Sequence, residues 1–320
     1  MTARVPRWEH TADEVLDGLD LRGLQAVVTG AAGGLGLETV SALARVGATV
    51  WLTARSADTA AAAAESITAS LGTVDVRPAE LDVGSVVSVR AFAEYLRSQT
   101  SYVDVLINNA GVMCPPEMRT VDGFEMQFGT NHLGHFHLTE LMVPLLHAAP
   151  AARIVNVSSA GHAMGDVDLT DPNYLERPYD PFDAYGQSKS ANILHVVGLQ
   201  ARLGPVGIDA FAVHPGAIRT SIGRHMDDAA RIELARRLDA QSDEHPIRWK
   251  SIPQGAATSV WAATSPELAG QGGHYCDDLE IAAPADFVPL AGGGVLPRVL
   301  DRFTAERLWV LSEKLLRDSV

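Results

Sequence analysis

The chain has 320 residues, a formal net charge of −14 and 47% hydrophobic residues. This length and composition can supply one large α/β domain with a substantial core, and the negative charge argues against nucleic acid or an anionic membrane surface as a partner. Cys114 and Cys276 lie far apart and form no metal-type pair, so we expect reduced thiols in a cytoplasmic protein. No signal peptide opens the chain, and no apolar stretch is long enough for a membrane span.

Residues 1–24 are a polar lead-in, where Thr11 and Glu14 have the spacing of a capping box. We expect this N-terminal extension to pack on the main domain. From residue 25 onwards strands and helices alternate. The predicted strands cover 25–29, 49–54, 74–81, 103–108, 153–158, 208–214 and 273–277, and the predicted helices cover 35–46, 57–71, 85–98, 122–147, 185–203 and 254–264.

This alternation predicts an α/β fold with a parallel sheet and helices on both of its faces. The main domain is predicted to span 25–285, with substrate loops at 161–184 and 217–250. Residues 286–320 are predicted to form a C-terminal helical extension, because their apolar residues recur at helical spacing. In such a sheet ligands bind beyond the carboxyl ends of the strands, so the residues that follow each strand are the candidates for chemistry.

A glycine-rich turn, Thr29-Gly30-Ala31-Ala32-Gly33-Gly34-Leu35-Gly36, follows the first predicted strand. Glycine at positions 30, 34 and 36 permits a sharp turn and a close approach of the backbone to a ligand. The helix that begins near Leu35 points unpaired N–H groups at the turn, which suits a diphosphate. Since further strand and helix units follow, we interpret the turn as a nucleotide site rather than as a tight connection alone.

The residues after the next three strands extend this candidate site. Ala54 is neutral and Arg55 follows it, a pair that favours the 2′-phosphate of NADP over NAD; an ordinary surface arginine is the alternative. Asp82, followed by Val83, could accept a hydrogen bond from an adenine amino group. Asn108-Asn109-Ala110-Gly111 offers an amide and small residues beside a ribose, although each of these segments taken singly could be a turn.

Four motifs fall in the order and approximate spacing of the short-chain dehydrogenase/reductase family, which the chain resembles over about residues 20–280: the glycine turn, Asn108-Asn109-Ala110-Gly111, Tyr185-Gly186-Gln187-Ser188-Lys189 and Pro215-Gly216. Residues 122–136 are most similar to the retinol-dehydrogenase-like branch and its bacterial relatives. The resemblance implies a single-domain Rossmann-type three-layer sandwich with a doubly wound parallel sheet, a nicotinamide cofactor and chemistry at an alcohol or carbonyl carbon. It also implies a homo-oligomer of undetermined size.

Tyr185 and Lys189 are four residues apart at the predicted start of a helix, so their side chains share one face. An ammonium there can favour the phenolate of a tyrosine whose free pKa is about 10. Together with an oxidised nicotinamide, Lys189 would bring the pKa of Tyr185 toward the working pH and make it a general acid or base. Seen alone, the same spacing is that of an ordinary amphipathic helix.

The resemblance implies roles for further residues. Ser159, rather than Ser158, would hydrogen-bond the substrate oxygen, and Asn131 matches the position whose carbonyl-bound water links the lysine to solvent. Together with Tyr185 and Lys189 they are the candidate catalytic residues. The candidate cofactor contacts are Gly30, Gly34, Leu35, Gly36, Arg55, Asp82, Val83, Asn109, Ala110, Gly111, Tyr185, Lys189, Pro215, Ile218 and Thr220.

Five histidines raise the question of a metal site or of further substrate contacts. His132, His135 and His137 do not complete a metal site with a carboxylate or thiol pattern, so we expect no metal. His162 and His214 lie near the expected pocket, and either could contact substrate. A packed or hydrogen-bonded imidazole is the more ordinary interpretation of both.

Tyr185 follows Ser159 by 26 positions, a longer interval than is usual in that family. We expect the inserted residues to form an ordered loop on the pocket wall, and 221–250 to form a helical flap over the substrate. The predicted function is an NADP-dependent alcohol dehydrogenase or carbonyl reductase that interconverts an apolar alcohol and its ketone or aldehyde. Two alternatives remain: a nucleotide-binding sensor without turnover, disfavoured by Tyr185 and Lys189, and a nucleotide-sugar epimerase or dehydratase, disfavoured by the short region after Pro215.

Overall fold

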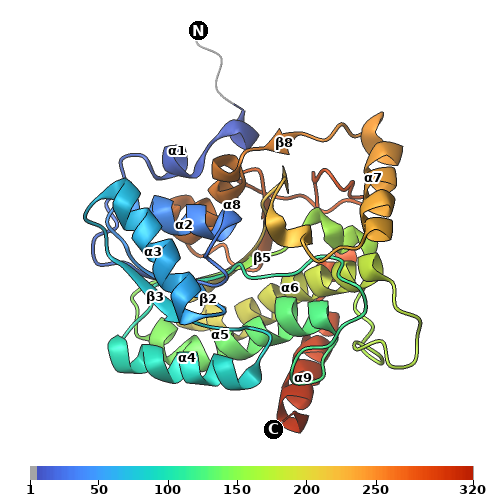
Figure 1. The fold of residues 1–320 in the computed structure, drawn as a ribbon, viewed down its shortest axis with the longest axis horizontal. Helices are drawn as coiled ribbons and strands as arrows, with labels where there is room; N and C mark the ends of the chain where they lie inside the picture. The colour runs from blue at the N-terminus through green and yellow to red at the C-terminus, as the bar shows by residue number, and fades with distance from the viewer. Residues whose placement is uncertain (1–5, 320) are drawn as a thin grey trace.

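A central sheet of eight strands lies between two layers of helices in the computed structural model, which describes residues 6–319 (Figure 1). The strand order is β10-β9-β6-β5-β4-β1-β2-β3, and all neighbouring strands are parallel except β9 and β10. The sheet contains β1 (Gln25–Val28), β2 (Thr49–Ala54), β3 (Val76–Glu80), β4 (Val105–Asn108), β5 (Arg153–Val157), β6 (Asp209–His214), β9 (His274–Asp277) and β10 (Glu280–Ile281).

The strand order reverses between β1 and β4, which makes the sheet doubly wound, as the sequence predicts. Gly30 follows β1 at this reversal with φ +62°, a conformation that favours glycine. A Cβ at this position would lie 2.8 Å from the Cα of Ala110 in the loop after β4. The two loops therefore meet closely, and a ligand at the reversal contacts both of them.

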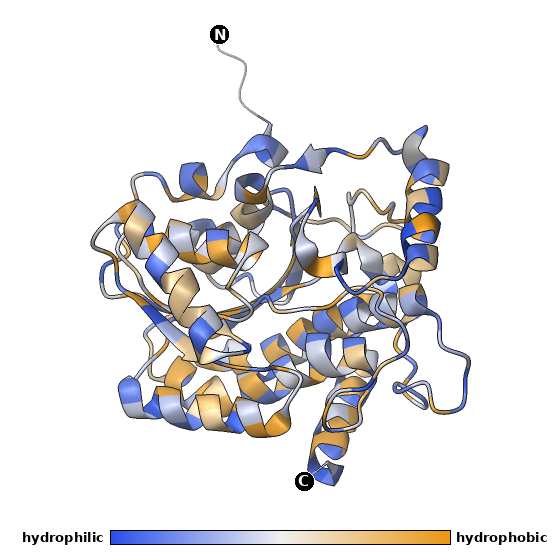
Figure 2. Cartoon of the chain, in the orientation of Figure 1, coloured by the Kyte–Doolittle hydropathy of each residue, from blue (hydrophilic) through white to orange (hydrophobic). Residues whose placement is uncertain are grey.

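The helices divide between the two faces of the sheet (Figure 1). Each layer buries its own apolar cluster against the sheet, and Figure 2 shows hydrophobic and hydrophilic residues alternating around helices such as α9. One layer contains α1 (Ala12–Leu16), α2 (Gly34–Arg45), α3 (Ala57–Leu71) and α8 (Ile252–Thr264), and the other contains α4 (Val86–Gln99), α5 (Gly134–His147), α6 (Pro181–Leu203) and α9 (Arg302–Asp318).

Both terminal extensions pack on these layers. The predicted capping box forms at α1, where Thr11 and Glu14 bond each other's backbone N–H groups, and α1 packs on α8; residues 1–5 of this extension lie outside the described residues. Helix α9 lies on α5 and α6, with the Trp309 ring 4.8 Å from that of Phe136. No helix within residues 6–319 combines the length and apolar character that a bilayer span requires.

Two helices begin elsewhere than the sequence predicts. The helix predicted from 185 begins at Pro181, because the Asp180 side chain accepts hydrogen bonds from the N–H groups of Phe182 and Asp183, at 2.8 and 2.9 Å. The helix predicted over 122–147 begins later than predicted, since residues 121–124 form turns and bends. Its first part is a π-helix, Phe128–Leu133, which continues directly into α5.

Short elements were also missed. Strand β10 and a separate two-stranded sheet, β7 (Ala217–Ile218) with β8 (Trp249–Lys250), have two residues in each strand, too few for a periodic pattern to identify them. Between β7 and β8 lies α7 (Asp228–Ser242), within the segment predicted as a helical flap. The β7–β8 pairing brings the two ends of the segment that contains α7 together.

Replacing Gly134 by alanine is expected to destabilise the fold by about 1–3 kcal/mol, because the new Cβ would overlap the carbonyl of Val83. Urea unfolding of the variant beside wild type measures this. Gly33→Ala is the control, because its Cβ would meet nothing within 4 Å. Gly123→Ala would not serve, since Gly123 has a φ of +87°, which disfavours alanine. Equal stability of Gly134→Ala and Gly33→Ala would contradict the close packing of α5 on the β3–α4 connection.

Candidate active site

A cavity of roughly 460 Å³ opens at the carboxyl ends of the strands, at the reversal between β1 and β4. Its volume is in the range of small-molecule and cofactor sites. All fifteen predicted cofactor contacts line it, together with Ser159; Asn131 does not. The structure therefore brings widely separated segments of the chain to one cavity, among them Gly30–Gly36, Arg55, Leu81–Gly84, Asn109–Met113, Val157–Met164, Tyr185 with Lys189, and His214–Arg224.

The glycine turn is fixed to the loop after β4 by Thr29, a residue whose positioning role the sequence analysis missed. Its hydroxyl accepts hydrogen bonds from the N–H groups of Asn109 and Ala110, both at 2.9 Å. The Asn109 side-chain amide donates to the Thr29 carbonyl at 2.7 Å. A Cβ on Gly36 would lie 2.6 Å from that amide, so the start of α2 packs directly on Asn109. This arrangement holds the N-terminus of α2 toward the cavity, where its N–H groups suit a diphosphate.

Tyr185 lies on α6 with its ring buried, and the ring touches Gly161, where a Cβ would lie 2.6 Å from Tyr185 Cε1. Burial raises the pKa of the Tyr185 phenol, while a hydrogen bond with the Ser159 hydroxyl lowers it. Ser159 follows β5, and its hydroxyl also accepts from the Gly161 N–H at 3.0 Å. The phenol and the hydroxyl thus face the same part of the cavity.

Lys189 is buried one turn after Tyr185. Its ammonium donates to the carbonyl of Val157 at 2.9 Å and lies 5.7 Å from the centre of the Tyr185 ring. Burial lowers the pKa of Lys189 to about 8. Burial raises the pKa of Tyr185 in the protein without cofactor. That Lys189 and an oxidised nicotinamide together lower this pKa stays a prediction.

Asn131 lies in the π-helix, outside the cavity lining. Its side chain bonds the backbone of Val112 in both directions at 2.9 Å, and its amide donates to the Ser188 hydroxyl at 2.9 Å. Its backbone carbonyl lies 3.1 Å from Nδ1 of His135. Asn131 therefore ties the loop after β4 to the helix turn that carries Lys189.

Arg55 and Arg224 both line the cavity and are exposed at its rim. His225 lies close enough to both guanidinium groups for their charge, after partial burial, to lower its pKa. Neither arginine forms an ion pair within the described part of the chain. In a protein with a net charge of −14, such a gathering of unpaired cations suits an anionic ligand group. Arg224 could not be identified from the sequence, because it lies in a polar segment rich in arginine.

Apolar side chains outside the predicted cofactor contacts also line the cavity. Of the predicted substrate loop 161–184, only Gly161 and Met164 line it, so the expectation of a pocket wall along this whole segment is too wide. The segment 217–250 contributes more, and Leu290 comes from the C-terminal extension, which the sequence analysis did not connect with the site. These additional apolar residues include Met113, Val121, Met126, Met164, Ile222, Leu234, Leu238 and Leu290.

The histidines serve different purposes. His162 is not part of the lining; its ring bonds the Ser159 carbonyl at 2.8 Å and accepts from the Leu296 N–H at 3.2 Å. His214 lines the cavity, and its Nε2 has no hydrogen-bond partner within the described residues. His132 and His135 are buried in the core. Within residues 6–319, no group of three or more His, Cys, Asp or Glu could hold a metal ion.

The short chain dehydrogenase family matches residues 25–231 of this chain. The chain is 42% identical to "Probable oxidoreductase" of Streptomyces lividans over 91% of its own length and 97% of that protein. It is 39% identical to human retinol dehydrogenase 13, covering 92% of this chain and 85% of the human protein. The Pseudomonas aeruginosa RhlG/NADP active-site complex superposes with a TM-score of 0.63 at 26% identity, over 81% of this chain and 95% of the other.

These matches agree with the fold and with the motifs around the cavity. The relatives are oxidoreductases, and retinol dehydrogenases are among them. The family binds a nicotinamide cofactor, which the glycine turn and the cavity beside it can accommodate. The chain is a member of the short-chain dehydrogenase family of oxidoreductases, related to the retinol dehydrogenases.

Proposed function

We propose that the protein is an NADP-dependent oxidoreductase that interconverts an apolar alcohol and its ketone or aldehyde, with Tyr185 as the general acid or base. One observation carries this proposal. Tyr185, Ser159 and Lys189 lie close together and line the same cavity as the glycine turn and Arg55. Proton-transfer groups and a phosphate-binding turn in one cavity are the arrangement that nicotinamide-dependent chemistry needs.

The protein's residues are suited to hold the cofactor and the substrate oxygen. The N–H groups at the start of α2 would bind the diphosphate, Asp82 would contact the adenine, and Ile218 and Thr220 would contact the nicotinamide; all these residues line the cavity. A bound nicotinamide would supply or accept the hydride. At pH 7 a group with a pKa of about 8 is mostly protonated, so Lys189 would present an ammonium to the ribose and to Tyr185.

Tyr185 would exchange a proton between its phenol oxygen and the substrate oxygen, while the Ser159 hydroxyl donates a hydrogen bond to that same oxygen. Burial alone opposes the phenolate form. When an alcohol is oxidised, the positive charges of Lys189 and of an oxidised nicotinamide would both favour the phenolate. In carbonyl reduction the protonated phenol that burial favours is the form required, so the protein environment suits Tyr185 as a proton donor.

The apolar part of the cavity supports an apolar substrate. The test is NADPH oxidation by the purified protein over a panel of apolar aldehydes and ketones that includes retinal. The expected result is turnover of at least one carbonyl, faster for apolar than for polar compounds of similar size. Tight NADPH binding without turnover of any carbonyl, or of any alcohol with NADP⁺, would favour the sensor. Turnover of a nucleotide sugar instead would favour the epimerase or dehydratase.

Cofactor preference gives a separate prediction. Arg55→Ala and Arg224→Ala are each expected to weaken NADPH binding about tenfold or more while leaving NADH binding nearly unchanged, because a charge-assisted hydrogen bond to a phosphate contributes about 1.5–3 kcal/mol. Fluorescence titration with both cofactors measures the two dissociation constants. Arg231→Ala is the matched control: this arginine is nearby on α7, donates to the Gly223 carbonyl at 3.3 Å and does not line the cavity. Equal weakening of NADPH and NADH would contradict recognition of the 2′-phosphate.

A further inference from the structure

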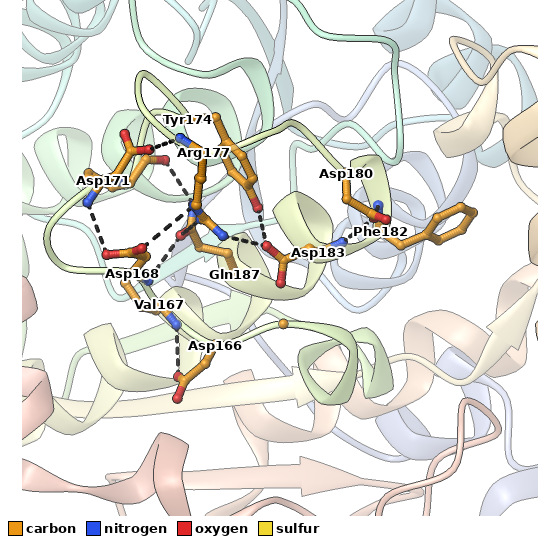
Figure 3. A network of polar contacts seen from close by, with 12 residues as sticks. Asp166, Val167, Asp168, Asp171, Tyr174, Arg177, Asp180, Phe182, Asp183 and Gln187 are labelled. Atoms are coloured by element: carbon orange, nitrogen blue, oxygen red, sulfur yellow. Dashed lines mark hydrogen bonds and ion pairs between the residues drawn. The ribbon is translucent and has the colours of Figure 1, made fainter.

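The segment between Met164 and α6 turns away from the cavity and wraps around the first turns of α6 (Figure 3). It contacts α6 at both of its ends. At its start, a Cβ on Gly186 would overlap the backbone of Gly165, so the segment and the helix are in direct backbone contact there. At its end, Arg177 reaches two side chains of α6. The insertion between Ser159 and Tyr185 is therefore built against the helix that carries Tyr185.

Arg177 is the centre of the polar contacts in this segment (Figure 3). Its Nη1 donates to Asp183 Oδ2 at 2.6 Å, and its Nη2 donates to Gln187 Oε1 at 2.8 Å. Its Nε lies 3.7 Å from Asp168 Oδ2. The guanidinium also stacks on the Tyr174 ring, 3.7 Å from the ring centre. A planar fork with several N–H groups can hold two acceptors at once, which an ammonium on a flexible stem cannot do in the same way.

The two acceptors flank Tyr185 at equal distance along the helix. Asp183 and Gln187 are four residues apart and so share one face of α6. Tyr185 lies two residues from each, about 200° around the helix, and faces the cavity. Arg177 thus spans the turn of helix that carries Tyr185 from the opposite side.

The position of Arg177 is itself fixed by the segment. The Asp171 carboxylate accepts hydrogen bonds from the N–H groups of Leu175, Glu176 and Arg177, at 2.7, 3.0 and 3.1 Å. On the helix side, the Tyr174 hydroxyl donates to Asp183 at 2.6 Å. The Gln187 amide donates to the Pro172 carbonyl at 2.9 Å, and Gln187 is completely buried. The bridge therefore connects a loop and a helix turn that are each held by further hydrogen bonds.

We propose that Arg177 is a positioning residue for Tyr185: by bridging Asp183 and Gln187 it holds the catalytic turn of α6 at the depth and rotation that place the phenol against the substrate oxygen. The inference rests on the proposed function, since it assigns Arg177 to the proton-transfer step. It gives the insertion before Tyr185 a role in catalysis rather than in forming the substrate wall. Since a misplacement of about 1 Å can lower a rate about 100-fold, a small rotation of this turn is enough to matter.

The test compares Arg177→Met with Arg202→Met. Arg202 is a matched control on the far end of α6: it stacks on Trp309 at 4.0 Å, donates to Glu306 at 2.7 Å and lies outside the cavity lining. Arg177→Met is expected to lower kcat about tenfold or more, with the KM for NADPH and its dissociation constant within about twofold of wild type. Arg202→Met is expected to keep kcat within about twofold of wild type.

Arg177→Lys serves as a second variant if Arg177→Met does not fold, and it is expected to have an intermediate kcat because lysine can bond one acceptor but not both. Amide hydrogen exchange over residues 183–189 gives a measurement that does not depend on turnover. Faster exchange of this turn in the Arg177 variants than in Arg202→Met supports the bridge even if no substrate has been found. The proposal is overturned if both Arg177 variants keep the wild-type kcat, or if amide exchange over residues 183–189 is unchanged. If the wild-type protein turns over no substrate but the Arg177 variants exchange faster, the result counts against the proposed function alone.

Discussion

Replacing Tyr185 by phenylalanine is expected to lower kcat by at least about 100-fold, because a positioned general acid or base contributes about 10²–10⁴ to the rate. The change removes one oxygen atom from a buried side chain and leaves the packing against Gly161 in place. NADPH binding should therefore stay within about threefold of wild type, since the glycine turn and the arginines are untouched. Steady-state kinetics with the best carbonyl of the panel, beside an NADPH titration, measure both quantities.

Tyr275→Phe is the matched control for this experiment. Tyr275 is also buried, on β9, and its hydroxyl has no hydrogen-bond partner within the described residues. It does not line the cavity, and its ring packs on His162 at 5.3 Å. Loss of its hydroxyl is expected to leave kcat within about twofold of wild type. If the two variants lost activity to the same extent, the special role of the Tyr185 phenol would be refuted.

The stability of the fold is expected to decrease steeply as the pH falls from about 6.5 to 5, because five core histidines are held neutral. Burial lowers the pKa of His132 and His214 to about 3 and that of His135 and His162 to about 4, and it lowers the pKa of His195 further below its usual value. In the unfolded chain these groups titrate near about 6.5. Below that pH the unfolded state binds protons that the folded state does not, so the free energy of unfolding falls.

Each such histidine contributes a slope of about 1.4 kcal/mol per pH unit in this window. Glu125 acts in the opposite direction: burial raises its pKa to about 7, so the folded state holds a proton there that the unfolded chain, with a pKa near 4.5, releases. The stabilisation from Glu125 therefore increases as the pH falls through this range. It cancels the destabilising slope of about one histidine. The net slope is therefore expected to be roughly 5 kcal/mol per pH unit.

Urea unfolding at several values between about pH 6.5 and 5 measures this slope. His195→Gln is expected to reduce it by about 1.4 kcal/mol per pH unit, whatever the variant's absolute stability. His147→Gln, at an exposed position at the end of α5, is the control and should leave the slope unchanged. An identical slope in all three proteins would mean that the buried histidines do not account for the acid sensitivity.

The features of this fold that could be predicted from sequence are local. The glycine turn after β1, the alternation of strands and helices, and the spacing of Tyr185 and Lys189 depend on near neighbours, and the doubly wound sheet followed from them. Boundaries that depend on a side chain bonding backbone a few residues away, such as Asp180 at the start of α6, were missed, because several nearby residues could have capped the helix equally well.

Which distant residues share the cavity, and how burial changes their pKa values, depends on tertiary packing. Leu290 and Arg224 reach the cavity through chain paths that no local pattern encodes. Burial raises the pKa of Tyr185, and the extent of burial depends on how the whole chain packs around the ring. The insertion was predicted to form a wall of the substrate pocket. It packs against α6 instead, where Arg177 donates hydrogen bonds to two acceptors separated by one helical turn. Contacts of this kind are properties of packing, and packing is set by the whole chain.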